Sequence, residues 1–153
     1  MEFFEQAPAC FTNSVDINAS PERVFDAFED ADSWPQWAFP ITKVTWTSPT
    51  PFRLGTTRTV EMRGGMTGYE EFIAWDRGKR MAFRFNEATM DSIAAFGEDY
   101  IVEETSAGCR LTWIMAMEPA GSSKFIVPLF GPIMKWNFGR MLRNFAKLVE
   151  KSY

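Results

Sequence analysis

Apolar and polar residues alternate most clearly near the end of the chain, over residues 109–118. One face of this segment carries Leu111, Trp113, Met115 and Met117, and the other carries Arg110, Thr112, Ile114, Ala116 and Glu118. A period of two residues is typical of a β-strand. Residues 81–86 repeat the pattern, with Met81, Phe83 and Phe85 set against Ala82, Arg84 and Asn86. Both segments are therefore predicted to be strands that present large apolar side chains to one interior.

Turn residues divide the middle of the chain into strand-like segments. The predicted strands there cover residues 43–47, 56–63, 68–75, 81–86, 93–104 and 109–118, and an earlier strand covers residues 11–18. Three connections are short and contain the turns Gly64-Gly65, Asp76-Arg77-Gly78 and Ser106-Ala107-Gly108. Such turns join antiparallel neighbours. The pattern predicts a sheet of seven strands that is mostly a meander.

Helical signals follow the first strand and return at the C-terminus. Ser20 before Pro21 is an N-cap signal, so a helix carrying Val24 and Phe28 is expected, followed by a short helix or turn over residues 32–37. Near the end, a three- and four-residue spacing is typical of an amphipathic helix packed on the sheet; its members are Met134, Phe138, Met141, Phe145 and Leu148. Two prolines and a glycine within residues 125–132 predict a bent lead-in to this helix.

Length and composition fit a single domain spanning residues 1–153. The chain is 46% hydrophobic and 16% aromatic, with fifteen Phe and six Trp. A chain of this length can bury about two thirds of its unfolded surface. The aromatic content predicts either a dense core or a pocket lined with rings.

Charge and cysteine content exclude several classes of protein. The formal charge is −4 with a pI near 4.9, which argues against nucleic-acid binding because phosphate contacts need clustered Lys and Arg. The first residues resemble neither a signal peptide nor a membrane anchor. Cys10 and Cys109 form no CxxC pair, which favours a reducing compartment. A cytoplasmic location is expected.

The chain contains no histidine. This removes the usual general base, the commonest zinc ligand and every Ser-His or Cys-His dyad. Phosphate-loop signatures are also absent from the sequence, and the glycines of residues 64–68 fit a hairpin turn. We expect no metal and no cofactor.

Methionine and tryptophan side chains form the sharpest candidate ligand wall, made of Met115, Met117, Met134, Met141 and Trp113. Flexible thioethers and flat rings accommodate varied apolar shapes. The alternative is ordinary core packing, which periodic apolar positions mostly indicate, and it is expected for roughly half of these residues. Trp34 and Trp37 fit either the mouth of a cavity or a hydrophobic plug.

Charged residues on the strands leave two interpretations open. Tyr69, Glu71, Ile73 and Trp75 share one predicted strand face, and Glu61 and Arg63 share another. An inward carboxylate could hold a substrate hydroxyl or act as an acid or base with a raised pKa. The favoured alternative for Glu61 and Glu71 is a solvated sheet face with cross-strand Arg partners, because lone acids are rarely buried. Arg84 has the same ambiguity.

Four motifs, spread over nearly the whole chain, resemble the SRPBCC superfamily, also called START-like or helix-grip proteins. They are Ala-Ser-Pro-Glu-Arg-Val-Phe at residues 19–25, Trp-Pro-Gln-Trp at residues 34–37, Trp-Asp-Arg-Gly-Lys-Arg-Met-Ala-Phe at residues 75–83 and Ala-Gly-Cys-Arg-Leu-Thr-Trp at residues 107–113. They occur in the expected order on the expected elements, and the nearest branch resembles the bacterial polyketide cyclase/dehydrase and lipid-transport group.

The resemblance implies an α+β helix-grip fold, in which a seven-stranded curved antiparallel sheet wraps around the long C-terminal helix, with two short helices after the first strand. It also implies a cavity for lipids, sterols, polyketides or plant-hormone-like compounds. Family membership of this kind constrains architecture better than activity. In that architecture the first strand pairs with the last, which places Cys10 and Cys109 at opposite ends of the pair and predicts no disulfide.

Three functions remain in competition. The first is binding or transport of a small hydrophobic ligand, and the second is a cyclase or dehydrase that uses Tyr69, Glu71 and Arg84; the sequence leaves enzymatic activity open. The third is an interaction protein that presents the basic C-terminal helix and residues 125–133 to a partner or, transiently, to a membrane. A homodimer is also left open. The predicted ligand-binding residues are Trp34, Trp37, Tyr69, Glu71, Phe83, Phe85, Trp113, Met115, Met117, Met134, Phe138 and Met141.

Overall fold

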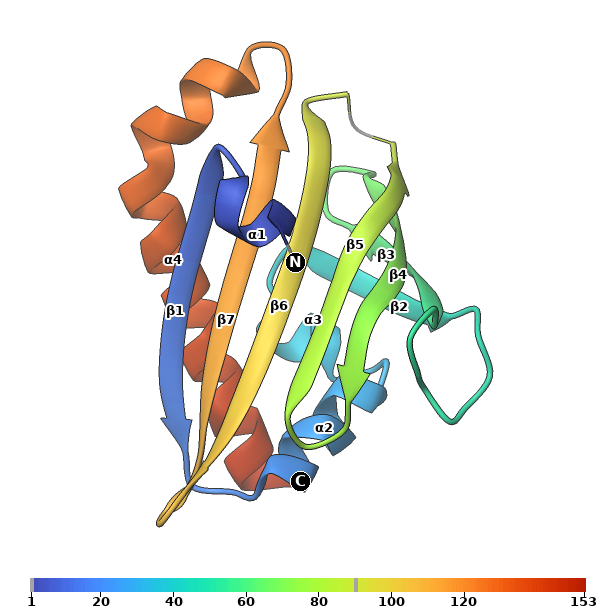
Figure 1. The fold of residues 1–153 in the computed structure, drawn as a ribbon, viewed down its shortest axis with the longest axis vertical. Coiled ribbons are helices and arrows are strands. Elements are labelled where there is room, and N and C mark those ends of the chain that lie inside the picture. Colours follow the sequence, from blue (N-terminus) through green and yellow to red (C-terminus); the bar gives the residue numbers. More distant parts are fainter. Residues whose placement is uncertain (1, 90) are drawn as a thin grey trace.

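A curled antiparallel sheet runs alongside one long helix in the computed structural model, which describes residues 2–89 and 91–153 (Figure 1). The strand order is β1-β7-β6-β5-β4-β3-β2. The strands are β1 (Ala9–Ile17), β2 (Ile41–Trp46), β3 (Thr57–Met62), β4 (Thr67–Asp76), β5 (Arg80–Ala88), β6 (Ile93–Thr105) and β7 (Gly108–Pro119). The helices are α1 (Glu2–Gln6), α2 (Pro21–Glu29), α3 (Trp34–Trp37) and α4 (Ser123–Ser152).

The predicted α+β helix-grip fold is confirmed. Each predicted strand is present with both ends within two residues of the expected positions, and α2 and α3 are the two short helices after β1. The pairing of the first strand with the last is also observed, with Ile17 opposite Cys109 and Cys10 opposite Ala116. Both cysteines are free thiols, at opposite ends of this ladder. Helix α1 was not predicted from the sequence.

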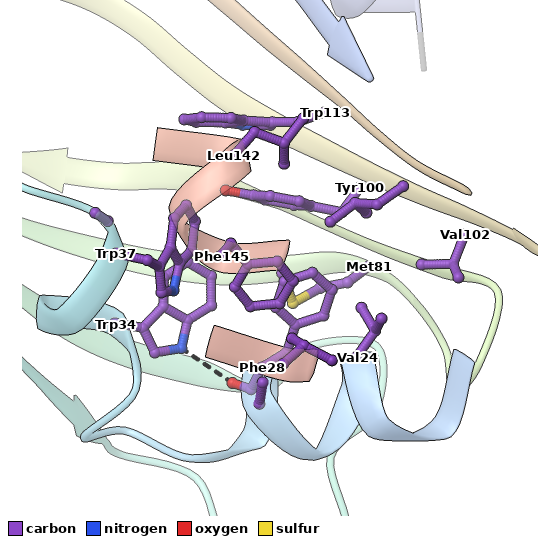
Figure 2. Packing of buried hydrophobic residues seen from close by; sticks show 14 of the residues in the cluster. Val24, Phe28, Trp34, Trp37, Met81, Tyr100, Val102, Trp113, Leu142 and Phe145 are labelled. Atoms are coloured by element: carbon purple, nitrogen blue, oxygen red, sulfur yellow. Dashed lines mark hydrogen bonds between the residues drawn. The ribbon is translucent and has the colours of Figure 1, made fainter. Parts of the chain in front are cut away.

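Helices α2 and α3 are stabilised because their apolar side chains are buried in the same core. Ser20 is extended before Pro21, and the first turn of α2 then leads to the fully buried Val24 and Phe28. The Trp34 indole donates a hydrogen bond to the Phe28 carbonyl at 3.0 Å, as Figure 2 shows. The Ser33 hydroxyl donates to the Ala27 carbonyl at 2.5 Å. These two bonds tie α3 to α2.

Helix α4 begins earlier than the amphipathic spacing indicated. The expected bent lead-in is itself helical, with Pro128 and Pro132 inside the helix. Each proline lacks the N–H that would bond to the preceding turn, and Figure 1 shows the helix bending in its first half. The buried residues of α4 all lie in the second half, and they are Leu142, Phe145, Ala146 and Val149. Within the described residues, the hydropathy of the helices is too low for any of them to traverse a bilayer.

Aromatic rings fill much of the interior between the sheet and α4. Phe28 stacks on Phe145 at 5.0 Å between ring centroids, and Tyr100 stacks on Trp113 at 5.6 Å (Figure 2). Trp37 packs edge-on against Phe145 at 4.9 Å. Aromatic contacts of this kind stabilise a core beyond the area that they bury. These packed rings lie next to the site described below.

The pairing of β4 with β5 contains two irregularities, and the second changes which residues of β4 face inward. The pairing of β4 with β5 shifts register between Tyr69 and Glu70 and again between Phe72 and Ala74. At the second shift two residues of β4 oppose one of β5, which is a β-bulge. Because each extra residue reverses the alternation, side chains before and after the bulge follow different phases.

Candidate functional site

A cavity of about 190 Å³ lies between the inner face of the sheet, α3 and α4. Its walls are mainly apolar and come from every strand except β1, together with α3, α4 and two loops. The lining residues are Trp34, Trp37, Ala38, Pro40, Ile41, Arg58, Val60, Met62, Met66, Glu70, Phe83, Phe85, Ile93, Phe96, Glu98, Tyr100, Met115, Met117, Phe138 and Met141.

Eight of the twelve residues predicted to bind a ligand line this cavity. Four elements contribute two residues each: Trp34 and Trp37 lie on α3, Phe83 and Phe85 on β5, Met115 and Met117 on β7, and Phe138 and Met141 on α4. The strand pairs converge because residues two apart share a face, and the helix pair converges because residues three apart do. Their role in binding stays a prediction, but the fold brings them together.

Tyr69 and Glu71 do not line the cavity, and the structure corrects their predicted position. Tyr69 is 45% exposed, and Glu71 forms an ion pair with Arg84 on the outer face at 3.3 Å. In this part of β4 the inward side chain is Glu70, one residue away. Trp75 does face inward and stacks on Phe72, since the bulge between Phe72 and Ala74 reverses the phase.

The other charged candidates also point outward. Glu61 pairs with Lys43 at 3.7 Å, and the guanidinium of Arg63 donates from Nε to the Phe39 carbonyl at 2.8 Å. The alternative interpretation of Glu61 and Glu71, a sheet face turned to solvent with cross-strand cationic partners, is confirmed, although the partner of Glu61 is a lysine.

Trp113 and Met134 lie next to the cavity without lining it. Trp113 is buried behind Tyr100 and packs against Phe138 with 5.4 Å between ring centroids, so it belongs to the core. Met134 lines a second groove of about 590 Å³ along α4. That groove shares Pro40, Phe138 and Met141 with the cavity, so these three residues separate the interior site from the outside.

Sequence reasoning missed a cluster of polar side chains at the inner end of the cavity. Arg58 and Glu70 lie opposite each other on β3 and β4, and Arg58 Nε donates to Glu70 Oε2 at 2.5 Å. On β6, the Tyr100 hydroxyl donates to Glu98 Oε2 at 2.5 Å. All four side chains are buried. A buried ion pair such as Arg58–Glu70 is rare in the wall of an apolar cavity and requires an explanation.

Aromatic rings surround the Arg58 guanidinium. Its central carbon lies 4.0 Å from the centre of the Trp34 ring and 4.7 Å from the centre of the Phe83 ring. Contacts of a cation with ring faces offset part of the cost of removing the charge from water. They also hold the guanidinium in one orientation within the wall.

Burial changes the protonation of the two carboxyls and the phenol. Burial raises the pKa of Glu98 to about 8; the Tyr100 hydrogen bond opposes this shift and the neighbouring Glu70 reinforces it. Burial also raises the pKa of Glu70, although Arg58 opposes that shift. The pKa of Tyr100 lies well above its usual value because of burial and the nearby Glu98. At neutral pH the Glu98 carboxyl is therefore mostly protonated, and Tyr100 is a neutral phenol.

The cluster had a signal in the sequence. Arg58 occupies the same strand phase as Val60 and Met62, and on β6 a similar alternation runs through Phe96, Glu98, Tyr100 and Val102. A polar residue inside an apolar phase indicates a buried polar group. Chemically, the cavity combines apolar walls with one cationic donor and one protonated acid. The described residues contain no group of three side chains suited to hold a metal ion.

Comparison with known proteins gives consistent results. The profile of a family described as "Polyketide cyclase / dehydrase and lipid transport" matches residues 8–150. An uncharacterized protein of Mycobacterium tuberculosis (strain ATCC 25618 / H37Rv) is 48% identical over 153 residues, covering 100% of this chain and 92% of its own length. An uncharacterized protein of Mycobacterium bovis matches to the same extent.

Solved structures share the fold at low sequence identity. A crystal structure of TTHA0849 from Thermus thermophilus superposes with a TM-score of 0.74 at 17% identity and covers 92% of this chain and 96% of its own. A START superfamily protein from Mycobacterium smegmatis has a TM-score of 0.67 at 14% identity, covering 92% of this chain and 94% of its own. At such identities the likeness shows the fold alone.

Proposed function

Because this chain belongs to the polyketide cyclase / dehydrase and lipid transport family, we propose that it binds a small, mostly apolar molecule in the cavity beneath α4. The observation that carries this proposal is the cavity itself, which remains open within an interior otherwise packed with stacked rings. Removing apolar ligand surface from water against such walls is favourable by about 25 cal/mol per Å². Pre-formed apolar cavities with a few polar groups are typical ligand sites.

Filling the cavity tests the proposal. In Met115→Trp the larger ring takes up space on the cavity wall, so the affinity for the apolar probe tetralin, measured by calorimetry, is expected to fall about tenfold or more. The matched control is Ile114→Trp, one residue away on the same strand and outside the cavity. It is expected to bind tetralin as the unmodified protein does.

Native mass spectrometry of the protein purified from cells extends this test to natural ligands. The unmodified protein and Ile114→Trp are expected to retain an apolar compound that Met115→Trp lacks. Absence of both a retained compound and tetralin binding in the unmodified protein contradicts the proposal.

A second candidate function, contact with an anionic membrane, is favoured by the exposed first half of α4. Phe125 is 82% exposed and Leu129 is 74% exposed, and the same half also exposes Ile126, Phe130, Ile133 and Trp136. Helix α4 carries six of the sixteen basic residues of the chain and one acidic residue, Glu150, although the whole chain is acidic. Apolar and basic side chains on one helix are the features of helices that lie in a membrane interface.

Liposome flotation tests this second function. The protein is expected to float with phosphatidylglycerol-containing vesicles at low salt, and the variant Phe125→Ser/Leu129→Ser is expected to lose most of that binding. Leu54→Ser is the matched control, because Leu54 is 69% exposed but lies outside α4. Flotation should weaken in about 0.5 M salt, since ions screen the basic residues. Equal flotation of all variants, or none by the unmodified protein, would count against membrane contact.

The cyclase or dehydrase alternative stays a prediction. Tyr69, Glu71 and Arg84, the residues first considered for acid or base chemistry, lie on the outer face of the sheet and outside the cavity. A reaction inside the cavity would have to use other groups.

A further inference from the structure

The cavity wall contains nitrogen donors without acceptors. Within the described part of the chain, five buried side-chain polar atoms have no hydrogen-bond partner, and all five are N–H donors. Three of them belong to lining residues: Nη1 and Nη2 of Arg58 and Nε1 of Trp37. The donors of the site therefore outnumber the acceptors that the protein supplies to them.

The orientation of Arg58 explains this excess. Its ion pair with Glu70 uses Nε, which leaves both terminal nitrogens without an acceptor. The faces of the guanidinium lie near Trp34 and Phe83, which offer no hydrogen-bond acceptor of ordinary strength. Leaving a buried charged donor unpaired is costly, so a partner is expected to occupy this position when the site is filled.

Resting on the proposed binding function, we propose that the inner end of the cavity recognises an uncharged ligand that carries a carbonyl oxygen, which accepts hydrogen bonds from Nη1 and Nη2 of Arg58. Ketones and quinones have this chemistry. The rest of such a ligand lies against the apolar and aromatic walls.

The charges around the inner end favour a neutral oxygen over a carboxylate. Arg58 and Glu70 already balance each other as an ion pair. The pKa of Glu98 is raised, so its carboxyl is mostly protonated and uncharged at neutral pH. It therefore cannot balance the charge of a ligand anion. A ligand carboxylate would therefore place a second negative charge beside the buried Glu70. A carbonyl satisfies the same donors and adds no charge.

The shape of the walls favours a flat hydrocarbon skeleton. Rings of Trp34, Trp37, Phe83, Phe85 and Phe96 line the cavity, and offset or edge-on contact with a flat ring is their preferred arrangement. Phe138 and Met141 border both the cavity and the open groove along α4. A substituent on the ligand could extend past these two side chains toward the groove.

Three probes of matched size separate the carbonyl from the rest of the ligand. They are 1-tetralone, tetralin, and tetralin-1-carboxylate, measured by calorimetry at pH 7 with the full chain. Since hydrogen bonds to a charged donor favour the ketone, we expect 1-tetralone to bind about tenfold or more tighter than tetralin. The carboxylate is expected to bind more weakly than the ketone.

A pair of double variants assigns the preference to Arg58. In Arg58→Met/Glu70→Met the ion pair is replaced by apolar side chains of similar length, which avoids leaving Glu70 alone in the interior. The preference for 1-tetralone over tetralin is expected to fall to about threefold or less in this variant. Arg84→Met/Glu71→Met is the matched control, because it removes a cross-strand Arg–Glu pair of the outer face, and it should keep the full preference.

The outcomes separate this inference from the proposed function. Equal affinity for tetralone and tetralin, or tighter binding of the carboxylate, overturns the inference and leaves apolar binding intact. A preference that survives in Arg58→Met/Glu70→Met overturns it as well, because the donor is then elsewhere. Failure of all three probes to bind contradicts the inference and the proposed function together.

Discussion

The single substitution Arg58→Met is expected to lower the free energy of unfolding by about 3–5 kcal/mol, measured by urea denaturation at pH 7. It removes the ion-pair partner of Glu70, which is buried with 4% of its surface exposed. It also removes a cation from its contacts with the rings of Trp34 and Phe83. Glu70 must then take up a proton or remain as an isolated buried charge, and both alternatives destabilise the fold.

Two further variants show whether the lost stability comes from the unpaired carboxylate. Arg84→Met breaks an ion pair in which Arg84 is exposed, and it should cost about 0–1 kcal/mol. Arg58→Met/Glu70→Met should regain most of the loss, since it leaves no unpaired charge inside. If the double variant is as unstable as the single one, the loss has another cause, such as altered packing around Trp34.

The variant Glu98→Gln is expected to be more stable than the unmodified protein at pH 9, with the difference disappearing toward pH 5. Folding raises the pKa of the Glu98 carboxyl from its ordinary value of 4.5 to about 8, chiefly through burial. The folded state therefore binds more protons than the unfolded state between these values, and stability falls as the pH rises through this window. At about 1.4 kcal/mol per pKa unit, the full effect is on the order of 5 kcal/mol.

The neighbours of Glu98 set the size of this effect. Arg58 and the hydrogen bond from Tyr100 favour the ionised form of Glu98, and Glu70 opposes ionisation. The lowered pKa values of Asp16 and Glu22 act at lower pH, and the pKa of Cys109, raised to about 11 by burial, acts at higher pH. Denaturation curves at half-unit steps from pH 5 to pH 9 measure the difference between the two proteins. Parallel curves would falsify the assignment of a raised pKa to Glu98.

The fold could be predicted from local signals because they agree with one another. The turns at Gly64-Gly65 and Ser106-Ala107-Gly108 separate segments with a clear period of two, so strand order and pairing follow with little freedom. The first half of α4 was harder to predict. Pro128 and Pro132 oppose helix formation locally, yet the helix continues through both of them at an exposed surface.

The site could be predicted where hydrophobic phase decides the direction of a side chain, as it does for Met115, Met117, Phe83 and Phe85. It could not be predicted along β4, where a one-residue difference separates the inward Glu70 from the outward Glu71 and the bulge between Phe72 and Ala74 resets the phase. Arg58 and Glu98 were missed for a related reason. Buried charges are rare enough that single-sequence reasoning places such residues in solvent unless a partner is visible.

The bonds between α2 and α3 have a consequence for the way a guest molecule enters and leaves. Trp34 and Ser33 are anchored to carbonyls of α2, so swinging this wall outward would break two buried hydrogen bonds at once. On α4, the lining residues Phe138 and Met141 are only partly buried and make no such hydrogen bond among the described contacts. We therefore expect a ligand of the proposed site to enter past Phe138 and Met141 on α4, because moving these side chains breaks ring contacts with Phe11 and Trp113 but no buried hydrogen bond.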